Sequence, residues 1–157
     1  MEEVPITLAG KNKIEAELNH LVKVEREEIK TAIAEARELG DLKENAEYHS
    51  AKERQSIIEG RIAQLQGILA RARVVEVAKI KSSRIVFGAT VNVLDHNGKN
   101  HTYKIVGDDE ADFTANKISY TSPLGRALIG KEEGDTVVVK APKGDVEYEV
   151  ESFEFID

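Results

Sequence analysis

Apolar residues recur along the first half of the chain at spacings of three and four positions, which is typical of amphipathic helices. In the first stretch the apolar positions run from Ile14 to Leu21 and resume from Ile29 to Ala36 in a shifted phase. In the second stretch the steps of four and three continue unbroken over three heptads. The positions concerned are Ala51, Gln55, Ile58, Ile62, Leu65, Leu69 and Ala72. A seam with two such positions per heptad predicts a coiled coil.

Only a few residues separate the two helical stretches, so we expect them to fold back on each other as antiparallel neighbours. Thr7 suits the N-cap of the first helix, and Gly40 suits the position after its end, where a positive φ is common. From Ile14 to Leu39 that helix would be roughly 40 Å long. A parallel dimer through each seam is the alternative, but it would need a longer loop or a partner chain. The sequence therefore predicts a long helical hairpin whose tip lies within residues 38–48.

The predicted tip contains two carboxylates three positions apart, Asp41 and Glu44. At a helix start this spacing is that of a capping box, in which the two residues serve only the helix end. Two carboxylates also supply part of the octahedral oxygen shell of Mg²⁺, which they would hold weakly without further ligands. If another protein adds ligands, the resulting centre suits phosphodiester hydrolysis by two metal ions. Both roles are compatible, because each carboxylate has several lone-pair sites.

Cationic and aromatic side chains flank the predicted tip. The cations are either ordinary solvated charges or a small basic patch that steers a nucleic-acid backbone toward the tip. Tyr48 would stack on a nucleobase or pack against the start of the second helix, and we interpret His49 as a surface residue. The four cations are Arg37, Lys43, Lys52 and Arg54.

After Arg73 the pattern changes, and from Ile85 onward its period is near two, as in β-strands. Asn97-Gly98 predicts a tight hairpin turn. A further strand pair is expected at residues 137–140 and 146–150. The second half should form a small antiparallel sheet, giving an α+β chain with an N-terminal domain over residues 1–78 and a C-terminal domain over residues 79–157.

One short helix is expected in the second half, with Ser122 as its N-cap, Pro123 as its first residue and Gly130 at its end. An acidic run lies upstream of it, and its spacing does not fit a Ca²⁺ loop. We interpret this run as a solvated turn. Its carboxylates belong to Asp108, Asp109, Glu110 and Asp112.

Composition narrows the possible functions. The chain has 157 residues and a net charge of -7, which argues against a broad, sequence-independent DNA-binding surface. It contains no cysteine, so it has no disulfide framework. No apolar run approaches the length of a membrane span, and the acidic N-terminus does not fit a secretory signal. We expect a cytoplasmic protein that does not associate with membranes.

Several ordered runs of residues closely resemble the Gre family of bacterial transcript-cleavage factors. The similarity covers the whole chain, and the tip run is the most specific part of it. The matching runs are Ala34–Glu38, Gly40–Tyr48, Phe87–Val91, Ile105–Phe113 and Ile129–Glu133.

The resemblance implies a transcription elongation factor that is not itself an enzyme. Its coiled coil would enter the secondary channel of a backtracked bacterial RNA polymerase and stimulate the polymerase to cleave the 3′ end of the nascent RNA. Asp41 and Glu44 would help to hold one Mg²⁺, shared with the polymerase, while the free protein would bind no metal tightly. The C-terminal domain would have an FKBP-like fold and dock on the channel rim through Ser122 and Pro123. The free protein is expected to be a monomer.

Two other classes fit the predicted elements. The first is a peptidyl-prolyl isomerase or chaperone, but aromatic residues make up only 5% of the chain and tryptophan is absent, which disfavours an aromatic-lined pocket. The second is a scaffold whose coiled coil binds a partner helix. A scaffold would tolerate Asp41→Asn and Glu44→Gln without loss of function, whereas a cleavage factor would not.

Overall fold

The computed structural model describes residues 2–157, and these divide into two compact units. The first unit comprises residues 11–72, and the second comprises residues 2–10 together with residues 73–157. The division after residue 72 lies near the predicted domain boundary between residues 78 and 79, which stays a prediction.

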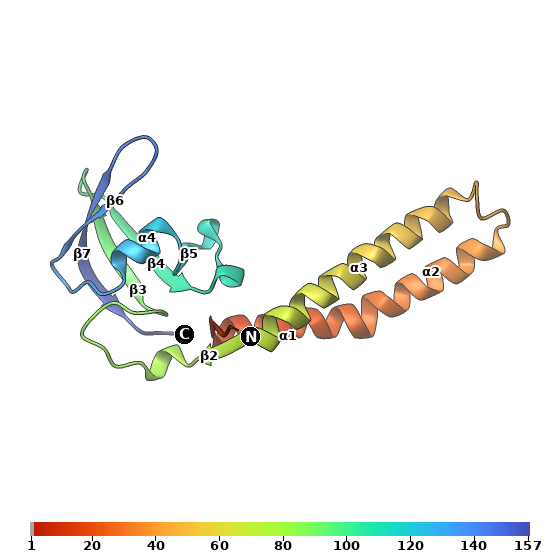
Figure 1. Cartoon of the computed structure of the whole chain (residues 1–157), viewed down its shortest axis with the longest axis horizontal. Coiled ribbons are helices and arrows are strands. Elements are labelled where there is room, and N and C mark those ends of the chain that lie inside the picture. The colour runs from red at the N-terminus through yellow and green to blue at the C-terminus, as the bar shows by residue number, and fades with distance from the viewer. Residues whose placement is uncertain (1) are drawn as a thin grey trace. The chain divides into compact units, whose positions relative to one another are not determined.

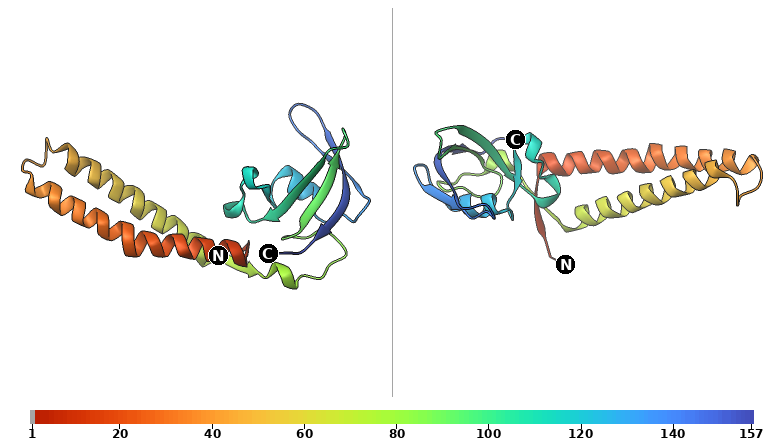
Figure 2. Two further views of the ribbon diagram at one scale, coloured as in Figure 1. Left: turned by 180° about the vertical axis from the view of Figure 1, so that it is seen from behind. Right: turned by 90° about the horizontal axis from the view of Figure 1, so that it is seen from above.

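Two helical segments run side by side in the first unit, and a loop joins them at one end (Figure 1). The views from behind and above show the same antiparallel pair (Figure 2), so the predicted hairpin is confirmed. Thr7 caps the first segment, because the Gly10 N–H donates to its Oγ1 at 3.0 Å. Gly40 follows the end of that segment with φ of 118°, as predicted. The helices are α1 (Leu8–His20), a π-helical turn (Leu21–Glu25), α2 (Arg26–Glu38) and α3 (Ala46–Arg71).

The π-helical turn explains the phase shift in the apolar pattern. Ile14 and Leu21 are seven residues apart, whereas Leu21 and Ile29 are eight apart, and all three side chains are buried. A π-helical turn takes up one extra residue, so the apolar stripe returns to the face that packs on α3. The buried residues of the hairpin are Ile14, Leu21, Ile29, Ile33, Ala36, Ala51, Ile58, Ile62, Leu65 and Ile68.

The end of α3 differs from the prediction. Ile68 is buried there, whereas Leu69, the residue expected in the seam, is only partly buried. The buried face of a globular helix is wider than a strict two-residue seam, so positions beside the seam are covered as well.

A curled five-stranded sheet forms the centre of the second unit, and a short helix, α4 (Pro123–Leu128), packs beside it (Figure 1). The strand order is β5-β4-β3-β7-β6. Neighbouring strands are antiparallel except for β4 and β5, which are parallel. The α+β fold and the hairpin turn at Asn97-Gly98 are confirmed, and the parallel strand is a feature that the sequence pattern did not predict. The strands are β3 (Thr90–Asp95), β4 (Asn100–Val106), β5 (Lys117–Ser119), β6 (Thr136–Val139) and β7 (Val146–Glu154).

The core of the second unit lies between this sheet and α4. Leu128 of α4 is fully buried, and every strand of the sheet contributes buried apolar side chains, including Ile118 of β5 and Val137 of β6 at the edges. Two further short strands, β1 (Val4–Thr7) and β2 (Ala72–Val75), pair with each other. The fully buried members of the core include Ile85, Ala89, Val91, Val93, Ile105, Leu128 and Val150.

The predicted short helix is also confirmed. The Gly125 N–H donates to Ser122 Oγ at 3.1 Å, Pro123 is the first helical residue, and Gly130 follows the end of the helix with φ of 90°. Within residues 2–157, no helix is both long enough and apolar enough to cross a membrane.

Candidate functional site

The loop at the end of the helical hairpin carries the two predicted site carboxylates. We define the tip loop as residues 39–45, between the last turn of α2 and the first turn of α3. The side chains of Asp41 and Glu44 are both exposed. Asp41 Oδ1 accepts the N–H of Lys43 at 3.0 Å, which forms a local turn inside the loop.

The capping box between Asp41 and Glu44 is not formed. The helix begins at Ala46, and its N-cap is Asn45, whose Oδ1 accepts the N–H of Tyr48 at 3.0 Å. This alternative was wrong, because the helix starts five residues beyond Asp41. Neither carboxylate therefore serves the helix end.

Side chains at the base of the tip loop connect the two helices. The Asn45 amide donates from Nδ2 to the Ala36 carbonyl oxygen at 2.5 Å. The guanidinium of Arg37 lies over the ring of Tyr48, with Cζ 5.7 Å from the ring centroid, which is a cation–π distance. Tyr48 thus packs at the helix start under Arg37, as one of its two predicted roles requires.

His49, in the first turn of α3, is hydrogen-bonded to the backbone of the tip loop. Its Nε2 lies 3.0 Å from the carbonyl oxygen of Lys43. Because a carbonyl oxygen only accepts, Nε2 carries the proton of this hydrogen bond. His49 is exposed, as expected, but its ring holds the loop backbone next to Glu44, a role that its lone position in the sequence did not suggest.

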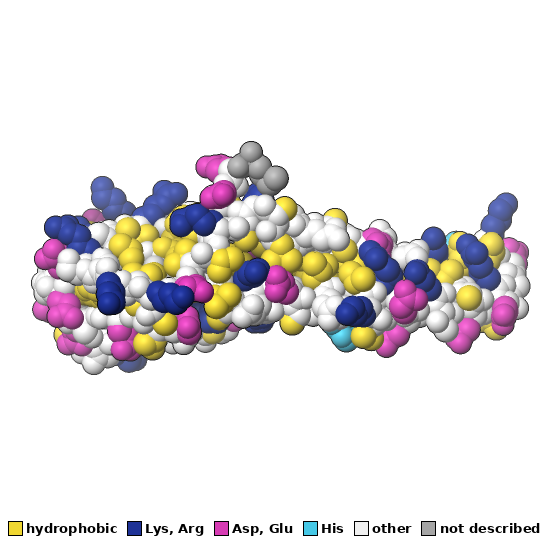
Figure 3. All heavy atoms as spheres, turned by 90° about the horizontal axis from the view of Figure 1, so that it is seen from below, with side chains coloured by type: hydrophobic (Ala, Val, Ile, Leu, Met, Phe, Trp, Pro, Cys, Tyr) yellow, Lys and Arg dark blue, Asp and Glu magenta, His cyan; other side chains and the backbone are white. Residues whose placement is uncertain are grey.

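The four predicted patch cations lie on different sides of the tip. Arg37 and Lys52 lie on the Tyr48 side, because Lys52 follows Tyr48 by four residues along α3, and Lys52 donates to Gln55 at 3.1 Å. Arg54 lies two residues further on, about 200° around the helix. Over the face of the helical unit in Figure 3, cationic and anionic side chains are interspersed.

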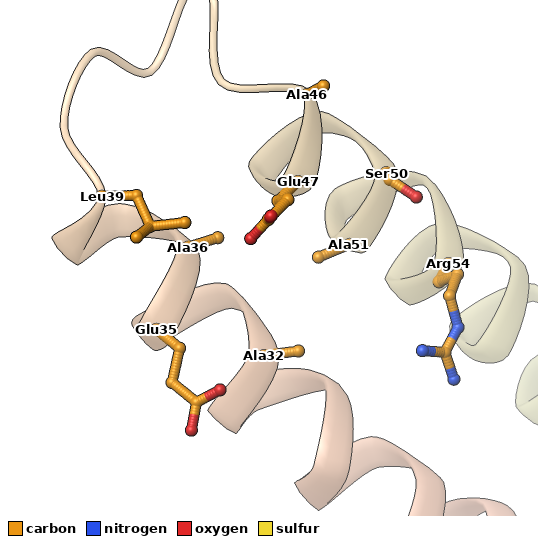
Figure 4. Close-up of a pocket in the computed structure, with 9 residues that line it drawn as sticks. All are labelled: Ala32, Glu35, Ala36, Leu39, Ala46, Glu47, Ser50, Ala51 and Arg54. Atoms are coloured by element: carbon orange, nitrogen blue, oxygen red, sulfur yellow. The ribbon is translucent and has the colours of Figure 1, made fainter.

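Arg54 points into a groove between the two helices next to the tip (Figure 4). The groove has a volume of about 570 Å³. The groove is open because alanines with small side chains line it on both helices, and Glu47 extends into it from α3. The lining residues are Ala32, Glu35, Ala36, Leu39, Ala46, Glu47, Ser50, Ala51 and Arg54.

Two ion pairs set the alignment of the helices that support the tip. Arg26 donates to both carboxylate oxygens of Glu59, at 2.8 and 2.7 Å. Arg61 likewise donates to both carboxylate oxygens of Glu17, at 2.6 and 2.9 Å. Hydrogen bonds from the guanidinium groups lower the pKa of both Glu59 and Glu17. Two-point pairing of this kind fixes orientation as well as distance.

The acidic run of the second unit is an exposed turn, as interpreted, with Glu110 partly buried. Its carboxylates also accept hydrogen bonds within the chain, which the sequence did not suggest. Asp108 accepts the hydroxyls of Ser119 and Thr121, the latter at 2.6 Å, and these hydrogen bonds lower its pKa. Glu110 accepts the N–H of Thr7 at 3.1 Å, the Thr7 hydroxyl, and the N–H of Gly107 at 2.9 Å.

Asp112 accepts the N–H and hydroxyl of Thr114, at 3.1 and 2.6 Å. Short polar side chains often bond neighbouring backbone in this way. In residues 2–157, no three His, Asp or Glu side chains gather closely enough to hold a metal ion.

Ser122 and Pro123, the predicted docking residues, begin α4. The Ser122 hydroxyl donates to the carbonyl oxygen of Ser119 at 2.6 Å and accepts the Gly125 N–H. Pro123 is exposed. The serine thus shapes the turn, while the proline ring remains on the surface.

Comparison with known proteins identifies the class. Residues 4–74 match the family described as transcription elongation factor, N-terminal, and residues 80–155 match the one described as transcription elongation factor, GreA/GreB, C-term. The chain belongs to the GreA/GreB family of transcription elongation factors. The predicted family and the predicted role as a transcription elongation factor are confirmed.

Individual relatives match over at least 95% of their length. The transcription elongation factor GreA of Thioalkalivibrio sulfidiphilus (strain HL-EbGR7) is 53% identical over 158 residues, which cover 99% of this chain and 100% of that protein. GreA of Anaeromyxobacter sp. (strain K) is 54% identical, with 100% and 95% covered. Among solved structures, the GreA factor homolog 1 (Gfh1) of Thermus thermophilus is 29% identical, with 98% and 99% covered and a TM-score of 0.45.

Proposed function

We propose that this chain inserts its helical hairpin into the secondary channel of bacterial RNA polymerase and stimulates cleavage of the nascent RNA at its 3′ end in backtracked complexes. One observation supports the proposal above the others. The carboxylates of Asp41 and Glu44 are exposed at the end of the hairpin, and the helix cap that would explain their spacing is provided by Asn45 instead. Two negatively charged groups are therefore presented to a partner.

The tip residues fit a shared Mg²⁺. Both side chains offer hard carboxylate oxygens, which Mg²⁺ prefers. Asp41 uses Oδ1 for the Lys43 N–H and has Oδ2 as a second acceptor. Two carboxylates supply only part of an octahedral shell, so the polymerase and the RNA would provide the rest. When bound in such a centre, Mg²⁺ activates water and stabilises charge on the phosphodiester oxygens.

The other tip residues have roles that follow from their positions. Arg37 and Lys52 lie on the Tyr48 side, so they would attract the RNA backbone along that side of the tip. Lys43, beside Glu44 in the loop, and Arg54, in the groove, would act on other sides. In the second unit, Pro123 on the surface and Ser122 beneath it would contact the channel rim.

The test is RNA cleavage in an arrested elongation complex. Bacterial RNA polymerase carrying an end-labelled transcript is stalled, and the purified protein is added with Mg²⁺. We expect the transcript to shorten and then to be extended again when nucleotides are supplied. If no shortening occurs with any bacterial polymerase tested, the proposal is wrong.

A matched pair of double variants locates the activity. Asp41→Asn with Glu44→Gln removes two charges at the tip, and Glu28→Gln with Glu53→Gln removes two from exposed positions along the same helices. We expect the first double variant to bind polymerase but to lose cleavage, and the second double variant to keep both binding and cleavage. Equal cleavage by the two variants would show that the tip carboxylates are not required.

A further inference from the structure

Asn45 makes two hydrogen bonds to two different helices with one side chain. Its Oδ1 accepts the Tyr48 N–H at the start of α3, at 3.0 Å. Its Nδ2 donates to the Ala36 carbonyl oxygen in the last turn of α2, at 2.5 Å. The first bond is an ordinary helix cap, whereas the second spans the hairpin.

The second bond closes the base of the loop that carries both site carboxylates. Carbonyl groups in the last turn of a helix lack helical partners, and the Ala36 carbonyl accepts only the Leu39 N–H, at 3.2 Å, from its own segment. The Asn45 amide adds a partner from the far side of the loop. Residues 37–44, including Asp41 and Glu44, thus lie between two atoms that are held 2.5 Å apart.

Other residue types could cap the helix but could not close the loop. Aspartate and serine cap about as well as asparagine. Aspartate has no N–H to donate to a carbonyl, and the serine hydroxyl is too short to cap and to reach across the hairpin together. Asparagine is the capping residue that offers an acceptor and a donor on one rigid group.

We infer that Asn45 is a positioning residue for transcript cleavage, because its amide holds the tip loop in the conformation that presents Asp41 and Glu44. This inference rests on the proposed function. In this role Asn45 acts through the backbone that carries the two carboxylates, since both bonds of its side chain go to backbone groups. The Lys43 N–H bonded to Asp41 and the Lys43 carbonyl bonded to His49 then fix the middle of the loop.

Variants that keep the cap and lose the bridge test this role. Asn45→Ser and Asn45→Asp retain an N-cap acceptor but have no N–H that reaches Ala36, and Asn45→Ala loses both functions. Gln66→Ser is the control, because it removes an exposed amide from the same helix about six turns from the tip.

The first measurement needs no polymerase. Hydrogen exchange of the loop amides that have acceptors, those of Gly40 and Lys43, is followed by NMR in the free protein, together with thermal unfolding. In Asn45→Ser we expect these amides to exchange at least about tenfold faster, while the melting temperature stays within about 2 °C of the unchanged chain because the cap is kept. Unchanged exchange in Asn45→Ser would overturn the inference.

The second measurement is cleavage of the arrested transcript as a function of factor concentration. We expect Asn45→Ser and Asn45→Asp to lower the maximal cleavage rate at least about tenfold, while the concentration for half-maximal cleavage stays the same. Gln66→Ser should match the unchanged chain. If Asn45→Ser reaches the full maximal rate, the inference is wrong, whereas absence of cleavage by the unchanged chain would instead refute the proposed function.

Discussion

The tip loop and the acidic run at residues 108–112 both carry closely spaced carboxylates, but the two groups differ in the hydrogen bonds that they accept. At the tip, Asp41 and Glu44 are exposed, and the one hydrogen bond within the loop is local. In the second unit, Asp108 and Glu110 each accept from residues far along the chain, including Thr7 and Thr121. Carboxylates with similar spacing in the sequence thus have different roles in the two regions.

The difference shows how to separate structural from functional carboxylates. A carboxylate that accepts several hydrogen bonds from its own chain stabilises the fold, and its removal leaves donors without partners. A carboxylate held in the open by a glycine-containing loop contributes little to stability. Its charge is available to another molecule, which is the requirement for a shared metal centre.

The sharpest contrast is in activity. Asp41→Asn with Glu44→Gln should lower transcript cleavage by more than about 100-fold, since loss of groups around a metal centre has effects of that order or larger. Asp108→Asn with Glu110→Gln should keep cleavage per folded molecule within about twofold. The measurement is the cleavage rate at saturating factor, corrected for the folded fraction by circular dichroism. A large loss in the second pair would mean that both regions act in cleavage.

For stability we expect the opposite order, with the larger loss from the acidic run and the smaller from the tip. Glu110→Ala removes the acceptor for the Thr7 N–H, the Thr7 hydroxyl and the Gly107 N–H, so the free energy of unfolding of the second unit should fall by about 2 kcal/mol. Asp41→Ala should change the free energy of unfolding of the helical unit by less than about 0.5 kcal/mol. Urea unfolding is followed by the signal of the sheet for Glu110→Ala and by the signal of the helices for Asp41→Ala. Equal losses would show that exposure at the tip does not distinguish the two kinds of carboxylate.

Acid should affect the second unit through Asp95. Hydrogen bonds from His101 and from the Lys99 and Asn97 backbone lower the Asp95 pKa from 3.8 to about 2. Because the folded-state pKa is the lower one, Asp95 stabilises the fold above about pH 4 and loses this effect as the pH falls toward 2.

The melting temperature of Asp95→Asn should therefore fall less steeply between about pH 4 and pH 2 than that of the unchanged chain. Asp145→Asn is the control, since it removes one exposed carboxylate from a loop of the same unit. If all three proteins show the same slope, Asp95 does not contribute to acid sensitivity.

The smallest effect is expected where carboxylates and cations pair on the exposed helical surface. Arg26→Ala breaks the two-point pair with Glu59, yet the melting temperature of the helical unit should fall by no more than about 2 °C, because water and salt screen exposed pairs. The shift should shrink further in 0.5 M salt, since the screening length falls below about 5 Å. A larger shift that salt leaves unchanged would show that the pair acts by packing.

The sequence pattern predicted the elements well where a single rule decided them. Apolar spacing gave the helical hairpin, Asn97-Gly98 gave the β-hairpin, and Ser122-Pro123 gave the start of α4. It failed where two local rules competed. Asp41 and Glu44 satisfy the spacing of a capping box, but Asn45 is an equally good cap nearer to the helical stretch, and the spacing alone does not choose between them.

What the sequence by itself determined is the set of periodic elements and the chemistry within reach of the tip, because both depend on residues that are neighbours in the chain. The tertiary structure decided which polar groups are already satisfied. The Ala36 bond of Asn45 and the Thr7 bond of Glu110 join residues 9 and 103 positions apart, and no local spacing encodes such pairs. A polar group makes a limited number of hydrogen bonds. Whether it stabilises the fold or remains available to a partner therefore depends on which distant groups of the chain already bond to it.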